Sequence, residues 1–218
     1  MKKLVKGIVE FRQKALPEYR EKFARLALGQ SPDTLFIACS DSRVVPNLFA
    51  STDPGDLFVI RNVGNLIPEC GADGPPAADE SEAAADEFAI INLRGTDIFV
   101  CGHSDCGAMR ALMTGREKQA APNIRAWLRH GENALAQLAL HKNESDRVNA
   151  LSNINVLLQI EHLKTYPIVG ERLANNTLKL HGWWFDLSTA DVYAYEHAVS
   201  DFVLVDEEEA ARILSQLS

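Results

Sequence analysis

Three side chains of the types that bind zinc follow two apolar runs of the sequence. Cys39 ends the run "TLFIAC", and His103 and Cys106 come directly after the run "DIFVCG". Thiolates and imidazole are good zinc ligands, and three protein ligands leave a fourth coordination position open for chemistry. A His-x-x-Cys pair alone can occur by chance. Together with a third soft ligand at another strand end, it makes a metal site a fair hypothesis.

An acid and an arginine lie immediately beyond the first of these cysteines. In "CSDSR", Asp41 and Arg43 are two residues apart, so on an extended backbone they point the same way and can form a charge-assisted pair. Beside a metal, the Asp41 carboxylate could either close the fourth position as a ligand or, held by Arg43, accept a hydrogen bond from a zinc-bound water. The plainer alternative is a turn aspartate in a surface ion pair, which contributes little stability.

Strand and helix patterns alternate along the chain. The predicted strands are the apolar runs 34–39, 56–62 and 97–102, the alternating run 177–188, and "VYAYE" (192–196), which is expected to pair with 177–188. The predicted helices are 3–28 in two pieces broken near Pro17, 75–93, one opening at "CGAMRALMTG", 122–140, 145–166 stopped by Pro167, and the C-terminal "DEEEAARILSQL".

Apolar strands alternating with helices predict an α/β fold with a mainly parallel central β-sheet flanked by helices. We expect one domain over residues 1–218, with an N-terminal helical arm (1–30) and an α/β core (31–218). Function in such sheets gathers beyond the carboxyl ends of the strands. Cys39 and His103 both fall at such ends.

Composition excludes several classes of protein. A net charge of −8 argues against nucleic acid as a partner, because phosphate binding needs clustered Lys and Arg. No stretch approaches the roughly 20 apolar residues that span a bilayer, and the N-terminus lacks the apolar region of a signal peptide. We therefore expect no membrane partner and a cytoplasmic location.

Three motifs together resemble those of the β-class carbonic anhydrases. They are "CSDSR", "FVIRNVGN" and "CGHSDCGAM", in the family's order, and the detailed likeness runs from about residue 30 to 115. The resemblance implies one Zn²⁺ per subunit on Cys39, His103 and Cys106, with Asp41 and Arg43 as the catalytic dyad. It implies reversible hydration of carbon dioxide to bicarbonate, by attack of zinc-bound hydroxide.

The resemblance also implies a narrow substrate cleft at a subunit interface. Gln30 matches a glutamine that reaches substrate across a dimer, Phe58 and Val63 match apolar walls, and the backbone N–H of Gly107 faces the substrate. Phe88 stands where many members have a cleft-lining tyrosine, so a hydroxyl is missing here. A homodimer or homotetramer is expected.

Two other functions stay open at this point. The same fold and metal could hydrolyse carbonyl sulfide or carbon disulfide, since pocket shape decides the substrate. The chain could also be a catalytically silent, zinc-stabilised interaction protein. The pairing of Asp41 with Arg43 speaks against that second alternative, because a structural zinc site has no use for a dyad facing the metal.

Overall fold

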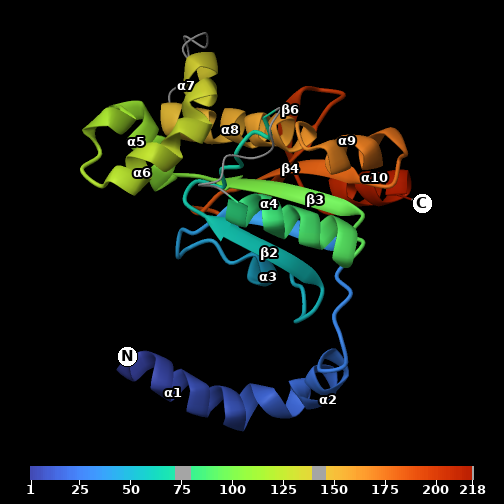
Figure 1. Ribbon diagram of the computed structural model, residues 1–218. Helices are drawn as coiled ribbons and strands as arrows, with labels where there is room; N and C mark the ends of the chain where they lie inside the picture. The colour runs from blue at the N-terminus through green and yellow to red at the C-terminus, as the bar shows by residue number, and fades with distance from the viewer. Residues whose placement is uncertain (72–79, 139–145, 218) are drawn as a thin grey trace.

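One six-stranded sheet forms the centre of the molecule, and helices cover it (Figure 1). The computed structural model describes residues 1–71, 80–138 and 146–217. The strand order is β2-β1-β3-β4-β5-β6. The strands are β1 (Thr34–Cys39), β2 (Leu57–Asn62), β3 (Asp97–His103), β4 (Lys179–Phe185), β5 (Val192–Glu196) and β6 (Asp201–Leu204).

The sheet is mainly parallel, as predicted. The strands β2, β1, β3 and β4 pair in parallel, and β4–β5 and β5–β6 pair antiparallel. The sequence analysis missed β6, because its four residues are too few to show a clear pattern. The structure thus has the α/β architecture that the alternation of elements indicated.

In the described part of the chain, the helices of the core differ from the prediction in four places, one of them the short helix Pro46–Phe49, which was not predicted. The helices are α3 (Pro46–Phe49), α4 (Glu80–Glu87), α5 (Gly107–Thr114), α6 (Pro122–Trp127), α7 (Glu132–Leu138), α8 (Arg147–Lys164), α9 (Pro167–Ala174) and α10 (Glu207–Leu217). The helix predicted over 122–140 is divided by a 3₁₀ turn at Leu128–Gly131. The helix predicted over 75–93 continues beyond α4 as a π-helical turn, Phe88–Asn92. Pro167 does stop α8, but it also begins α9, because proline is well tolerated in a first turn.

Parts of two predicted helices cannot be compared with the structure. Residues 75–79 and 139–140 lie outside the described part of the chain, as does residue 145. None of the described helices is both long and apolar enough to cross a membrane.

The two faces of the sheet pack against different partners. Leu35 and Ile37 point to one face of the sheet. There they join a core with residues of α4 and α8 and with Ile90, which lies just after α4. Phe36 points to the other face, where its ring lies 6.0 Å from that of Phe49 in α3. Because both faces are covered, β1 reads as a continuous apolar run.

The N-terminal arm extends away from this core (Figure 1). It consists of α1 (Lys2–Glu10), a π-helical turn (Phe11–Ala15) and α2 (Leu16–Leu26), and no residue of α1 or α2 is buried. The irregular turn lies just before Pro17, close to the predicted break. The arm exposes a row of large apolar side chains, Leu4, Val5, Ile8, Val9 and Phe11.

Candidate metal centre

Strand pairing brings the three predicted ligands together. β1 ends at Cys39 and β3 ends at His103, and the two strands are parallel neighbours, so their carboxyl ends meet. Cys106 follows on the short turn into α5. The sulfur atoms of both cysteines and a ring nitrogen of His103 all lie within 4.8 Å of one another, and all three residues are buried.

The ring of His103 is oriented for metal binding. Its Nδ1 lies 2.8 Å from the carbonyl oxygen of Ser104. A carbonyl only accepts, so Nδ1 carries the proton and Nε2 keeps its lone pair. That Nε2 is buried and has no hydrogen-bond partner in the structure. A buried lone pair between two cysteine sulfurs is the donor set that zinc prefers, so these residues fit the ion that the sequence implies.

The two cysteine sulfurs affect each other's protonation. The nearby Cys106 thiol lowers the pKa of the Cys39 thiol below its usual range, against the opposing effect of burial. Contacts with His103 and the backbone N–H of Gly64 add to that lowering. The same contact with Cys39 raises the pKa of Cys106 well above the usual thiol range. The centre therefore already favours a thiolate at Cys39.

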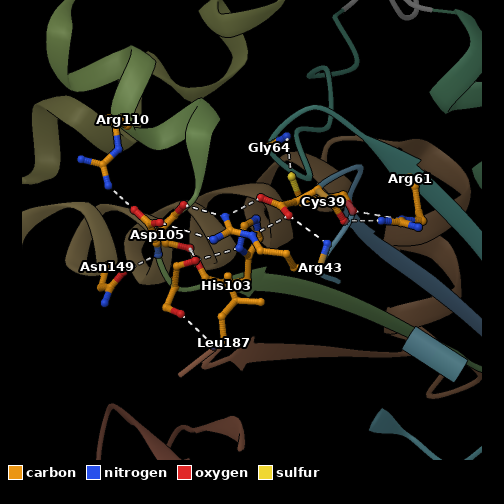
Figure 2. Close-up of polar contacts among 12 residues, drawn as sticks. Cys39, Arg43, Arg61, Gly64, His103, Asp105, Arg110, Asn149 and Leu187 are labelled. Atoms are coloured by element: carbon orange, nitrogen blue, oxygen red, sulfur yellow. Dashed lines mark hydrogen bonds and ion pairs between the residues drawn. The ribbon is translucent and has the colours of Figure 1, made fainter. Parts of the chain in front are cut away.

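Gly64 is a part of the centre that the sequence analysis did not single out. Its backbone N–H donates to Cys39 Sγ, with 3.4 Å between nitrogen and sulfur (Figure 2). Its φ of +86° is in the left-handed region, and a Cβ there would lie 2.8 Å from the Cβ of Ala108. Both facts require glycine. The glycine in "FVIRNVGN", directly after a strand that flanks the ligand strand, was the available signal.

Asp41 and Arg43 form the predicted pair. Arg43 Nε and its backbone N–H donate to Asp41 Oδ1 at 2.9 and 3.0 Å, and Nη2 donates to Oδ2 at 2.7 Å. These bonds hold the pKa of Asp41 well below its usual range. The carboxylate is not one of the group of ligand atoms gathered at Cys39.

Further contacts fix the position of the dyad. Arg43 Nη1 also lies 3.4 Å from the carboxylate of Asp105, which Arg110 pairs from its other side (Figure 2). Arg61 donates to the backbone carbonyls of Cys39 and Asp41, at 3.0 and 2.6 Å. The end of β1 is thus held by hydrogen bonds on both its main chain and its side chains.

Two of the residues predicted to line a substrate cleft are in contact with each other, and the other three are exposed. Phe58 of β2 and Phe88 are stacked, with ring centroids 5.7 Å apart. Val63 and Phe88 expose 38% and 41% of their surface, and Gly107 is exposed at the first position of α5. Gln30 is exposed on the segment that joins the arm to the core. Several residues predicted to line the cleft are thus open to solvent in the single subunit.

Sequence comparison assigns the chain to a family. The family model for carbonic anhydrase matches residues 34–192, a range that contains every metal-centre residue named above. A carbonic anhydrase of Pseudomonas aeruginosa is 40% identical over 214 residues, which are 97% of this chain and 95% of that protein. One from Synechocystis is 41% identical over 208 residues, 93% of this chain and 74% of that protein. The chain belongs to the carbonic anhydrase family.

Structural comparison identifies the class within that family. The structure of the β-carbonic anhydrase CcaA superposes with a TM-score of 0.85 at 40% identity, covering 94% of this chain and 98% of that one. A tetrameric β-carbonic anhydrase from Sordaria macrospora gives a TM-score of 0.76 at 26% identity, covering 89% and 97%. The protein is a β-class enzyme, and carbon dioxide hydration is the activity of its family.

Proposed function

We propose that the chain binds one Zn²⁺ per subunit on Cys39, His103 and Cys106 and uses it to hydrate carbon dioxide reversibly. The observation that carries the proposal is the buried, unpartnered Nε2 of His103, a residue with a ring nitrogen within 4.8 Å of two cysteine sulfurs. Zinc in such a site acts as a Lewis acid that lowers the pKa of water to about 7. Membership of the carbonic anhydrase family favours carbon dioxide over carbonyl sulfide or carbon disulfide as the proposed substrate.

In this proposal Asp41 and Arg43 handle the proton of the attacking water. Arg43 holds both carboxylate oxygens of Asp41 by its own donors, which keeps the group anionic and disfavours its rotation toward the ligands. Each carboxylate oxygen has further lone-pair capacity. Asp41 can therefore accept a hydrogen bond from water and orient it, while remaining outside the ligand set.

The cleft is proposed to bind substrate through apolar walls and one backbone donor. Phe58, Val63 and Phe88 present hydrocarbon, which suits a small apolar molecule such as carbon dioxide. Gly107 begins α5, so its N–H belongs to the first turn, whose amides lack partners within the helix. That N–H is available to the oxygen of a bound substrate or of bicarbonate.

We further propose a homodimer or homotetramer in the cytoplasm, in which a partner subunit covers the exposed residues of the cleft. The exposed apolar row of the arm needs a surface to cover it, and Gln30, at the base of the arm, would then reach the partner's cleft. The Sordaria macrospora relatives are described as tetrameric. This agreement supports oligomerisation of the present chain.

Stopped-flow assay of carbon dioxide hydration from pH 6.5 to 9, with the metal content measured in parallel, tests the proposal. We expect activity that rises with pH, disappears on removal of metal by a chelator and returns with one equivalent of zinc per subunit. Activity confined to values above about pH 8 would mean that Asp41 closes the metal at lower pH. A zinc-loaded protein inactive on carbon dioxide at every pH would overturn the proposal; turnover of carbon disulfide would then identify the alternative hydrolase, and its absence a binding protein.

A further inference from the structure

Helix α8 buries four polar side chains in one stripe that faces the metal centre. Ser152, Asn155, Gln159 and His162 follow one another at intervals of three, four and three residues, so they lie on one side of the helix. Each exposes 3% of its surface or less. Burying a polar group is costly unless it is hydrogen-bonded, so the partners of these four side chains are informative.

Each member of the stripe bonds to the backbone of His103 or of the segment 64–67 that follows β2. Ser152 Oγ donates to the carbonyl of His103 at 2.9 Å, and Asn155 Nδ2 donates to the carbonyl of Gly64 at 3.1 Å. Gln159 Oε1 accepts from the N–H of Ile67 at 2.6 Å.

Asn155 and Gln159 act on the peptide units around Gly64. Gln159 Nε2 donates to Asn155 Oδ1 at 2.9 Å, which turns the amide nitrogen of Asn155 toward the Gly64 carbonyl. The N–H of that same Gly64 residue donates to Cys39 Sγ. Gly64 is therefore held through its carbonyl by α8 while its N–H contacts a ligand sulfur. His162 holds the other end of the loop, with Nδ1 2.6 Å from the carbonyl of Ile67.

We propose that Asn155, supported by Gln159, is a positioning residue that holds the Gly64 N–H on the Cys39 sulfur and thereby sets the affinity of the centre for its metal. The inference rests on the proposed zinc site. A hydrogen bond to a thiolate draws electron density from the sulfur and fixes its direction. Partners of this kind outside the ligand set typically change metal affinity by about 10- to 100-fold when they are removed.

Two matched pairs of variants test this role. Asn155→Leu removes the donor with little change in volume, and Asn155→Asp keeps Oδ1 for Gln159 but removes the donor to Gly64. Asn153 is the control position, because it lies on the same helix and its side-chain oxygen is buried with no hydrogen-bond partner in the structure. Asn153→Leu and Asn153→Asp thus repeat both chemical changes away from the Gly64 loop.

The measurements are the Zn²⁺ dissociation constant, by chelator competition, and the thiolate-to-cobalt absorption band of the Co²⁺-substituted protein. We expect both Asn155 variants to raise the dissociation constant by about 10- to 100-fold. We also expect their cobalt band to move to lower energy, because a sulfur without its hydrogen bond gives up electrons more easily. Asn153 variants should match the wild type in both readouts.

Circular dichroism of the metal-free proteins shows which variants fold. If one substitution at a position prevents folding, the other substitution at the same position is used for the comparison. A folded Asn155 variant with unchanged affinity and an unchanged cobalt band would overturn the inference and leave the stripe with a packing role. A wild-type protein that binds neither Zn²⁺ nor Co²⁺ would instead overturn the proposed zinc site itself. The two failures are thus distinguishable.

Discussion

The Asp41 carboxylate is surrounded by the donors of a single neighbouring arginine. Three N–H groups of Arg43 point at its two oxygens, and Arg43 in turn contacts Asp105. An arginine fork is planar and rigid, so it fixes the plane of the carboxylate as well as its charge. The Asp41 carboxylate is therefore an oriented anion beside, but outside, the group formed by Cys39, His103 and Cys106.

Replacing Asp41 by asparagine tests that arrangement. Asp41→Asn keeps the shape but loses the anion, so we expect kcat/KM for carbon dioxide hydration to fall by about 10²-fold or more, as for removal of a positioned proton acceptor. The zinc content should stay at the wild-type value. Asp97→Asn is the control, since that carboxylate is also paired, to His181, but lies at the opposite end of β3. Equal activity of Asp41→Asn and wild type would contradict the role.

Single residues also show how far sequence reasoning reached. Cys39, His103 and Cys106 were predictable because strand ends and a short turn fix where their side chains meet. Their supporting contacts were not, because the glycine at position 64 does not indicate what its backbone N–H bonds to. His162 is buried and bonded to a loop carbonyl, a contact that depends on the packing of α8.

Among the elements, the positions of the strands were easier to predict than the breaks between helices. Apolar runs marked the strands that carry the site, since burial on both faces leaves few polar positions. The division of 122–140 and the π-helical turn after α4 depend on tertiary packing, which overrides local propensity.

The start of α8 links helix stability to the dyad. Asp146 caps the helix by accepting from the N–H of Asn149 at 3.3 Å and from its Nδ2 at 2.7 Å. Asn149 Oδ1 accepts from the N–H of Asp105, beside Arg43 (Figure 2). The cap therefore orients a side chain that holds the turn carrying Asp105.

Removing this cap should affect both stability and activity. We expect Asp146→Ala to lower the free energy of unfolding by about 1 kcal/mol in urea denaturation, the usual cost of a lost cap. Asp206→Ala removes the matching contact of α10, where Asp206 accepts from the N–H of Glu209 at 2.9 Å, and should cost a similar amount. Only Asp146→Ala should also lower carbon dioxide hydration. Equal activity losses in both variants would show a general effect of stability.

The whole molecule has a compact core and an arm that extends away from it, touching it near the end of α2, where Lys22 pairs with Asp53 (Figure 1). A helix that leaves its apolar face in water gains nothing from burial, so an isolated arm of this length would be marginally stable. A second subunit would supply the missing contact. The oligomer is thus expected to stabilise the arm as well as complete the cleft.

A charge placed on the apolar row tests this contact. We expect Ile8→Lys to shift the protein toward the monomer in sedimentation velocity, because it would bury a lysine in an apolar interface. Glu10→Gln, two residues from Ile8 and so on the opposite side of α1, makes the same change in net charge and should leave the distribution unchanged. A wild-type protein that sediments as a stable and active monomer would rule out the proposed assembly.

The place of α8 in the chain has a consequence for biosynthesis. The last ligand is Cys106, yet the stripe that steadies the centre ends at His162, so the ligands leave the ribosome well before their support does. At about 5–20 residues per second, synthesis of the intervening segment takes several seconds. During that time Cys39 and Cys106 are ordinary thiols on an unfinished sheet. We therefore expect zinc to enter a nearly complete chain, so the cell has to deliver the ion after translation of α8.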